Sequence, residues 1–241
     1  MQANQTWLHQ KIKALYSTKV DAAQESEIDV QGHKYRIDVF DEKQATAYEI
    51  QLSNFGRKFS NKIKTLLGGQ IRIVVVYPVA IREKVIWMGR VEAGRSRTIT
   101  KRSDVYSLFD ELVHFKIAFI PEQMGFDVLL TEEVVWKELF GFRGRTQRPR
   151  YRQVQRDLLD VRETRKFRSR ADFLDLLPKN LPSVFTNRHL AEQLAIKGGE
   201  RRKRRVAGRL TYSFCKLGLL DQVGINKRAH EFSIRETAPG S

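Results

Sequence analysis

Two acidic residues, Asp38 and Glu49, lie eleven positions apart in a stretch whose pattern favours a β-hairpin. Residues 34–40 and 45–52 alternate between apolar and polar side chains, which is typical of strands that bury one face. Residues 41–44 are polar and form the predicted loop between these strands. Two carboxylates on neighbouring strands repel each other when both are ionised, so this pattern predicts a site that holds a cation.

The expected register of the hairpin decides which face these side chains share. With residues 41–44 as the loop, Asp38 pairs with Ala47. Glu49 and Gln51 then project to the face of Asp38, because side chains two residues apart lie on the same side of a strand. The sequence therefore predicts two carboxylates and a carboxamide within diagonal reach of one another.

A third strand pattern precedes the hairpin and turns near Gly32. A two-residue turn at Gln31–Gly32 places Glu25 opposite Asp38, and a turn one residue later places Glu27 there. Both registers put Glu25 and Glu27 on the face of Asp38. Carboxylates that converge from three strands are ligands of the kind that Mg²⁺ or Mn²⁺ takes in proteins, so we expect a divalent-metal site.

The spacing of these residues resembles the PD-(D/E)xK nuclease superfamily. Asp38 is followed by Glu49-Ile50-Gln51 at the end of a hairpin and before a predicted helix. The resemblance implies an α/β fold with a restriction-endonuclease-like core of helix, three antiparallel strands, helix and strand, over roughly residues 1–80. It also implies Mg²⁺ ligands, which would be Asp38, Glu49, an acid from Glu25 or Glu27, and the backbone carbonyl of Ile50.

Two positions of the motif differ from the common family pattern. Arg36-Ile37 stands where the family has a proline before Asp38. Gln51 stands where most members have a lysine, and the segment EIQLS is similar to the E-x-Q branch that includes CoiA-type nucleases. In the implied mechanism Gln51 orients the attacking water, and Lys58 or Lys62 on the following helix supplies positive charge. The first predicted helix offers only His9 and Gln10 where the family often has a Glu.

A structural alternative remains for the acidic face. An ordinary antiparallel sheet also has one polar face, and Asp38 and Glu49 would then be solvated surface residues. Against this, apolar strand residues flank both acids, and the apolar run at residues 71–77 predicts a buried strand close by. We expect Pro78 to end that strand and Asn54 to cap the helix after the hairpin.

The charge balance of the chain predicts a polyanionic partner. Lysine and arginine number 44 against 28 acidic residues, which gives a formal net charge of +16. We expect double-stranded or branched DNA as the partner, with RNA and a merely basic protein as the alternatives. Cleavage of both strands of a duplex by one site per chain would favour a homodimer.

Cysteine usage and hydropathy predict the compartment. The single cysteine, Cys215, excludes an internal disulfide and fits a reducing cytoplasm. We find no signal peptide and no apolar run of membrane-spanning length, so we expect a cytoplasmic protein with no membrane partner.

Residues 141–165 are rich in arginine and also contain glycine and proline. This composition predicts a basic linker that follows a phosphate backbone, because the guanidinium group binds phosphate oxygens in pairs. A solvated linker without a partner is the alternative. The predicted phosphate contacts are Arg143, Arg145, Arg148, Arg150 and Arg152.

Residues 166–236 resemble a winged helix-turn-helix domain. A short helix, a second helix, a turn at Gly198–Gly199, a basic helix and a hairpin follow one another. Winged helices that bind proteins are the alternative. The residues expected on DNA are Arg201, Arg202, Lys203, Arg204, Arg205 and Arg209 from the third helix, with Lys227 and Arg228 from the wing.

The sequence thus predicts a Mg²⁺-dependent DNA endonuclease in two domains. Residues 1–140 would form the nuclease domain, residues 141–165 the linker, residues 166–236 the winged helix and residues 237–241 a disordered tail. The alternatives are a DNA-binding protein whose nuclease fold lost its activity with the change to Gln51, and an RNA nuclease.

Overall fold

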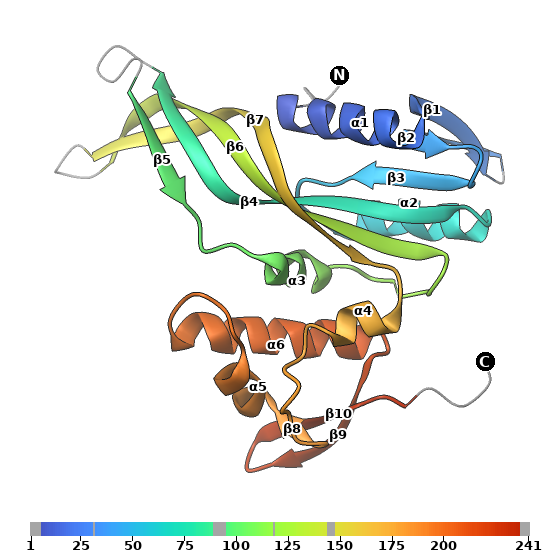
Figure 1. Ribbon diagram of the computed structural model, residues 1–241, viewed down its shortest axis with the longest axis vertical. Helices are drawn as coiled ribbons and strands as arrows, with labels where there is room; N and C mark the ends of the chain where they lie inside the picture. The colour runs from blue at the N-terminus through green and yellow to red at the C-terminus, as the bar shows by residue number, and fades with distance from the viewer. Residues whose placement is uncertain (1–5, 31, 89–94, 118, 144–147, 237–241) are drawn as a thin grey trace.

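The computed structural model describes residues 6–30, 32–88, 95–117, 119–143 and 148–236. The chain is a mixed α/β protein with a seven-stranded mixed sheet and a smaller three-stranded sheet (Figure 1). The large sheet and its helices form the N-terminal part, and the small sheet belongs to the C-terminal part. The predicted tail at residues 237–241 lies outside the described residues.

The helices are α1 (Trp7–Val20), α2 (Arg57–Gly68), α3 (Leu108–Leu112), α4 (Arg170–Leu174), α5 (Asn187–Gln193) and α6 (Glu200–Lys216), with a short 3₁₀ helix η1 (Val105–Ser107). The strands of the large sheet are β1 (Ala23–Val30), β2 (His33–Asp41), β3 (Thr46–Ile50), β4 (Arg72–Met88), β5 (Ser96–Thr100), β6 (Met124–Arg143) and β7 (Arg148–Phe167). The strands of the small sheet are β8 (Phe185–Thr186), β9 (Leu220–Asn226) and β10 (Ala229–Ile234).

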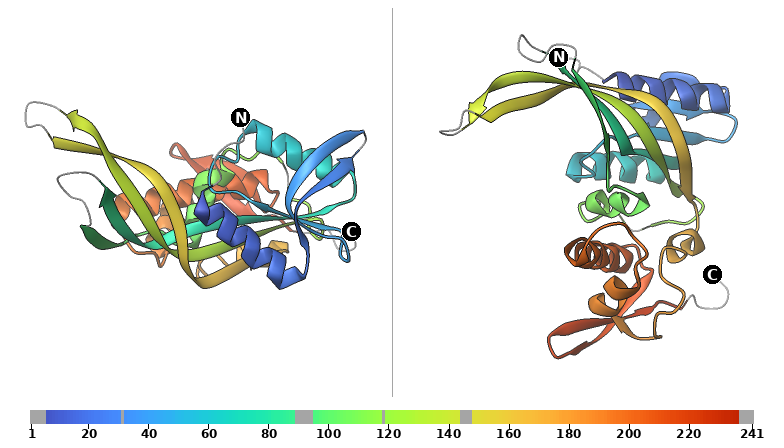
Figure 2. Two further views of the ribbon diagram at one scale, coloured as in Figure 1. Left: turned by 90° about the horizontal axis from the view of Figure 1, so that it is seen from above. Right: turned by 60° about the vertical axis from the view of Figure 1, so that its left-hand side comes forward.

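The large sheet has the strand order β1-β2-β3-β4-β6-β7, and β5 pairs with the outer part of β4. The pairs β1–β2, β2–β3 and β6–β7 are antiparallel, whereas β3–β4 and β4–β6 are parallel. The parallel connection from β3 to β4 runs through α2, as parallel neighbours require a crossover. The outer ends of β4–β5 and β6–β7 project beyond the helices as a curved arm (Figure 2).

Alternate side chains of β4 build a core on each face of the sheet. Val74 and Val76 pack with the buried face of α1, whereas Ile73 and Val75 pack with the buried face of α2. This is the continuous apolar run expected of a strand that is buried on both sides. The residues that α1 buries are Leu8, Ile12, Lys13 and Tyr16. The two helices therefore cover opposite faces of the sheet.

The prediction that Pro78 ends this strand is wrong, because β4 continues through it to Met88. The backbone N–H of Gln51 donates to the carbonyl of Val76, so the backbone groups of Val76 face β3. Backbone groups two residues apart point the same way, so those of Pro78 face the same side. The ladder with β3 ends at Val76. A backbone N–H at position 78 would therefore have no partner on β3. Proline, which lacks this N–H, is accommodated here without the loss of a hydrogen bond between strands.

The prediction of a basic linker at residues 141–165 is also wrong, because this segment forms the end of β6 and most of β7. Arginines of β7 bind acids of the neighbouring strand. Arg156 lies 2.7 Å from the fully buried Glu133, and Arg152 lies 2.8 Å from Glu138. An edge strand with one charged face has the composition of a linker, but it is protected from pairing with other chains by those charges.

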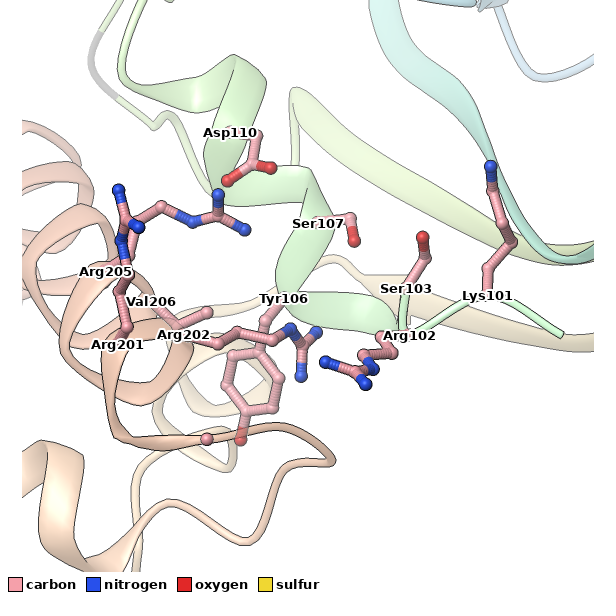
Figure 3. A pocket seen from close by; sticks show the side chains of 11 residues that line it. Lys101, Arg102, Ser103, Tyr106, Ser107, Asp110, Arg201, Arg202, Arg205 and Val206 are labelled. Atoms are coloured by element: carbon pink, nitrogen blue, oxygen red, sulfur yellow. The ribbon is translucent and has the colours of Figure 1, made fainter.

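The C-terminal part has the element order α4-β8-α5-α6-β9-β10, and its sheet has the order β8-β10-β9. Thr186 caps α5 as a side-chain acceptor, and Gly199 is the cap residue of α6. α6 runs beside η1 and α3 of the N-terminal part (Figure 3). None of the helices in the part of the chain that the structure describes has the length and apolar composition of a membrane span.

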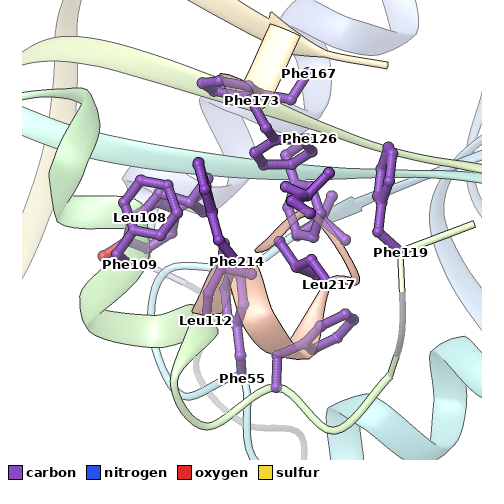
Figure 4. Packing of buried hydrophobic residues seen from close by; sticks show 14 of the residues in the cluster. Phe55, Leu108, Phe109, Leu112, Phe119, Phe126, Phe167, Phe173, Phe214 and Leu217 are labelled. Atoms are coloured by element: carbon purple, nitrogen blue, oxygen red, sulfur yellow. The ribbon is translucent and has the colours of Figure 1, made fainter. Parts of the chain in front are cut away.

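The two parts share one hydrophobic core. Phe214 of α6 packs edge-on against Phe109 of α3, with ring centroids 5.5 Å apart, and also against Phe173 of α4 at 6.2 Å (Figure 4). Phe173 in turn stacks on Phe167 at the end of β7, at 4.7 Å. Each of these rings is fully buried, which is worth about 2–3 kcal/mol a side chain. The C-terminal part is therefore attached through a continuous core rather than through a flexible linker.

Candidate active site

Asp38 lies where β2 and β3 separate. The ladder between these strands pairs Val39 with Tyr48 and Asp41 with Thr46, and extending it places Asp38 opposite Glu49. The prediction that Asp38 pairs with Ala47 is therefore wrong by two residues. A shift of two would preserve a shared face in a regular strand. The carboxylate of Asp38 nevertheless contacts α1 and that of Glu49 contacts α2, so the two side chains meet helices on opposite sides of the sheet.

The length of the hairpin explains this shift. Asp41 is buried and belongs to β2, so the turn consists of residues 42–45 instead of residues 41–44. Ala45 closes the turn in the left-handed region, with a φ of 45°. The side chain of Asp41 accepts a hydrogen bond of 3.2 Å from the N–H of Gln44 and thereby ties the turn to β2.

A side chain replaces the strand partner at this fork. The backbone N–H of Gln51 donates to the carbonyl of Val76 in β4. Backbone groups of successive strand residues point in opposite directions, so those of Ile50 face β2. The N–H of Ile50 donates to Oδ2 of Asp38 at 2.9 Å. By the same alternation, the carbonyl of Ile50 faces the gap between the two strands. The fork thus gathers a carboxylate, a second carboxylate opposite it and a backbone carbonyl.

Asp38 lies against two basic groups of α1. Nε2 of His9 and Nζ of Lys13 each lie 3.3 Å from its carboxylate. Burial opposes ionisation of Asp38, but the contacts with His9, the N–H of Ile50 and Lys13 outweigh burial, and the pKa of Asp38 lies below its ordinary value. Asp38 is therefore ionised at neutral pH.

Lys13 connects Asp38 to a third acid. Its side chain is only 3% exposed, and its Nζ lies 2.7 Å from Glu25. Glu25 also forms an ion pair with Arg36 of β2. A buried lysine needs such compensation, because an isolated buried charge is strongly destabilising. Sequence reasoning missed Lys13; the only signal was its position one helical turn after His9, and a helix lysine is ordinarily solvated.

Glu49 has one satisfied and one unsatisfied oxygen. Its Oε2 lies 2.7 Å from Nζ of Lys62, which also donates to the carbonyl of Arg36 at 2.6 Å. Its Oε1 is buried and has no hydrogen-bond partner among the described residues. Burial raises the pKa of Glu49 to about 7, with Lys62 opposing this rise and Asp38 adding to it. Glu49 is therefore poised to exchange a proton near neutral pH.

The structure separates the two acids predicted from the first strand. Ser26 lies opposite Ile37, which corresponds to the first of the two expected turns and sets Glu25 at the level of Asp38. Glu25 has a φ of 58°, a left-handed conformation that interrupts the alternation of β1. Glu27 is exposed and lies opposite Arg36, away from the fork.

Other predicted catalytic residues lie apart from the acids. The amide of Gln51 donates to the carbonyls of Ser53 and Asn54, in the loop before α2. Lys58 is exposed on α2, one turn before Lys62. The prediction that Asn54 caps this helix is wrong, because Gly56 is the cap residue. The structure therefore brings Lys62 to the acids but directs Gln51 toward the loop.

The predicted DNA-binding arginines of α6 fall into two groups. Arg202 pairs with Asp104 at 2.8 Å, and Arg209 pairs with Asp110, so these two face the N-terminal part instead of solvent. Their assignment as direct DNA contacts is corrected by these ion pairs. The remaining basic residues of this helix are the exposed Arg201, Arg204 and Arg205 and the partly buried Lys203.

The other predicted DNA contacts lie at the tips of two hairpins. Lys227 and Arg228 form the turn between β9 and β10 and are exposed. On the projecting arm, Arg150 stacks over Phe140, with its guanidinium carbon 4.8 Å from the ring centroid. Arg152 is engaged with Glu138. Arg145 lies outside the described residues, as do the side chains of Arg143 and Arg148.

Comparison with known proteins gives a family without an assigned activity. No curated protein and no solved structure matches the chain. A family model matches residues 6–168, which begin at the cap of α1 and end directly after β7. This region contains the large sheet and the fork at Asp38, and it covers well over half of the chain. The chain therefore belongs to the family described as Domain of unknown function (DUF8091).

Proposed function

We propose that this protein is a divalent-metal-dependent nuclease that hydrolyses phosphodiester bonds in DNA. The observation that carries the proposal is the fork itself, where ionised Asp38 lies opposite Glu49 and the carbonyl of Ile50 faces the gap. An unsatisfied buried carboxylate oxygen is rare in a folded protein and calls for a partner. A cation between Asp38 and Glu49 would be that partner.

The order of elements supports the same reading. α1, the antiparallel strands β1, β2 and β3, then α2 and the parallel strand β4 follow the order expected of a restriction-endonuclease-like core. The order α4-β8-α5-α6-β9-β10 is likewise that of a winged helix with its wing between β9 and β10. Fold order alone does not assign an activity, so the proposal depends on the residues at the fork.

The donor atoms at the fork fit a hard divalent cation. Carboxylate oxygens of Asp38 and Glu49 and the carbonyl oxygen of Ile50 are ligands of the type that Mg²⁺ and Mn²⁺ prefer. Within the described residues, no three side chains of His, Cys, Asp or Glu already surround one point, so backbone and water oxygens would complete the coordination. A bound Mg²⁺ would activate a water molecule and neutralise charge on the scissile phosphate.

The surrounding side chains have separate roles in this mechanism. Lys13 and His9 keep Asp38 ionised through their contacts with its carboxylate. Lys62 holds Oε2 of Glu49, while Oε1 is buried without a hydrogen-bond partner among the described residues and would be available to a cation. Above a pH of about 7 Glu49 loses its proton, and its carboxylate would then be able to hold the metal together with Asp38. Lys62, which contacts Glu49, would supply the positive charge that helps to stabilise the transition state.

A second candidate is a DNA-binding protein without catalytic activity. One observation favours it: Lys13 and Lys62 already balance charge at Asp38 and Glu49, as in a purely structural ion network. The amide of Gln51 is also engaged by the loop before α2. In this case the basic surface would bind DNA while the fork stabilises the fold.

One experiment separates the two candidates. Purified protein is incubated with supercoiled, linear and branched DNA, and with RNA, in Mg²⁺, in Mn²⁺ or in a chelator. The nuclease proposal expects metal-dependent nicking or cutting of at least one DNA. Binding without cleavage under every metal and substrate would replace it with the second candidate, and cleavage of RNA alone would move the activity to RNA.

A further inference from the structure

A basic groove of about 860 Å³ lies between the first half of α6 and the segment at residues 101–110. Figure 3 shows that one wall comes from α6 and the other from the chain that leads into η1 and α3. Its basic lining residues are Lys101 and Arg102 from the N-terminal part, with Arg201, Arg202 and Arg205 from α6. The groove therefore combines side chains about a hundred positions apart in the sequence.

Some of these charges are balanced and others are not. Lys101 lies 3.0 Å from Glu83, and the acid that lines the groove, Asp110, is paired with Arg209. Within the part of the chain that the structure describes, no ion pair joins Arg102, Arg201 or Arg205 to a carboxylate. Like charges that gather without a partner repel each other, so they raise the positive potential of the groove without stabilising the fold.

The paired arginines hold the two walls in place. Arg202 binds Asp104 of the opposite wall at 2.8 Å, and Arg209, about two helical turns further along α6, binds Asp110. Lys216 then donates to the carbonyl of Val113 at 3.0 Å. These contacts repeat along one side of α6, next to the shared aromatic core. The groove is therefore a preorganised surface, which lowers the entropic cost of binding.

One face of α6 leads on from the groove toward the end of the helix. Arg201, Arg205, Gly208 and Tyr212 follow one another at intervals of four, three and four residues, which places them on one helix face. Tyr212 is half exposed at the far end of this face. The spacing suits a helix that lies along a groove of duplex DNA while its basic end contacts a phosphate strand.

We propose that this groove binds the phosphodiester backbone of duplex DNA, gripped by Arg102 from the N-terminal part together with Arg201 and Arg205 from α6. Guanidinium groups bind phosphate oxygens in pairs, and the first turn of a 17-residue helix adds the positive end of its dipole. The proposal rests on the proposed DNA-binding function, and it makes Arg202 and Arg209 positioning residues. It also makes the family region, through Arg102, part of the DNA-binding surface.

The test uses the full chain and a fluorescent 20-base-pair duplex, with affinity measured by anisotropy at several salt concentrations. The Arg102→Gln/Arg201→Gln variant removes one charge from each wall. Each lost phosphate contact should lower the affinity roughly tenfold near 0.1 M salt and reduce the salt slope by about 1. Lys43→Gln/Lys34→Gln is the control, because Lys34 is exposed near the start of β2 and Lys43 is exposed in the turn between β2 and β3.

The outcomes distinguish this proposal from the proposed nuclease activity. If Arg102→Gln/Arg201→Gln lowers the affinity for duplex DNA and its salt dependence while the control does not, the groove is confirmed as a DNA-binding surface. This holds whether or not the parent cleaves DNA. If the parent binds and cleaves DNA but the groove variant binds like the control, the groove proposal is wrong and the nuclease proposal stands. If the parent binds no duplex, or if the loss appears only with RNA, the assignment to duplex DNA is wrong.

Discussion

The carboxylate of Asp38 accepts a 2.9 Å hydrogen bond from the backbone N–H of Ile50, so a side chain takes the place of a strand at the fork between β2 and β3. A buried backbone N–H without a partner costs about 1–3 kcal/mol, so this contact allows the two strands to separate. Glu49 lies opposite Asp38 at this fork and stays buried, at 5% exposed, and the carbonyl of Ile50 faces the same side of β3 as its N–H. The features that make the fork stable are therefore also those that make it a candidate active site.

Substitution of Lys13 should destabilise the protein strongly. Lys13→Met leaves Glu25 and Asp38 without their shared cation, and breaking a buried ion pair on one side costs roughly 3 kcal/mol. Urea unfolding followed by circular dichroism measures the loss. The control is Lys11→Met on the same helix, whose exposed pair with Asp157 is worth less than about 1 kcal/mol. Equal losses for the two variants would contradict the bridging role of Lys13.

Glu49 should make the stability depend on pH in a defined window. Its pKa rises from 4.5 to about 7 on folding, so the folded state binds the proton more tightly than the unfolded state. Proton binding by Glu49 therefore stabilises the folded state fully below pH 4.5. This contribution to the free energy of unfolding, about 3 kcal/mol in total, is lost as the pH rises to 7. The difference in unfolding free energy between the parent and Glu49→Gln, measured in a chelator from pH 4.5 to 8, reports it. A flat difference would show that burial does not control this group.

Part of the fold could be predicted from the sequence because its signals are local. Alternation at residues 34–40 and 45–52 located β2 and β3, and the continuous apolar run at residues 71–77 indicated the centre of β4. The sequence also placed Asp38 and Glu49 on neighbouring strands, but the register was wrong and their carboxylates contact different helices, α1 and α2. The register depends on how far each strand enters the turn, and Asp41 gave no sign of its burial.

The rest of the structure depends on contacts that are distant in the sequence. β7 resembled a linker because its acidic partners, such as Glu133 for Arg156, lie on another strand. Arg202 and Arg209 have the sequence pattern of DNA contacts, but Asp104 and Asp110 of the N-terminal part form ion pairs with them. A run of basic residues predicts that a helix has a charged surface. It does not predict which of those charges a neighbouring element neutralises.

Mg²⁺ should stabilise the parent and leave a site variant unchanged. A ligand that binds only the folded state adds about 2.7 kcal/mol at a hundred times its dissociation constant, which raises the melting temperature. Asp38→Asn keeps an oxygen for the N–H of Ile50 but loses the charge, so its melting temperature should not respond to Mg²⁺. Glu42→Gln, on the exposed turn, should respond like the parent. A response of equal size in Asp38→Asn would mean that the ion binds elsewhere.

The shared core predicts that both parts unfold together. Phe214 is fully buried against Phe109, and Phe→Ala at such a site costs about 3–5 kcal/mol. All three tryptophans lie in the N-terminal part, so their fluorescence reports the unfolding of that part alone. Phe214→Ala should shift the fluorescence transition by the full amount, and the exposed Tyr212→Ala by less than about 1 kcal/mol. An unshifted fluorescence transition would show that the C-terminal part unfolds independently.

The most direct test of the central proposal compares cleavage and binding in the parent and Asp38→Asn. In Mg²⁺, the parent should cut DNA, and Asp38→Asn should cut on the order of a hundredfold more slowly, because it removes charge from the metal site. Its affinity for the same duplex should stay within about twofold of the parent, since the basic groove beside α6 is intact. Cleavage by Asp38→Asn at the parental rate, under the same metal and salt, would contradict the assignment of the active site to this fork.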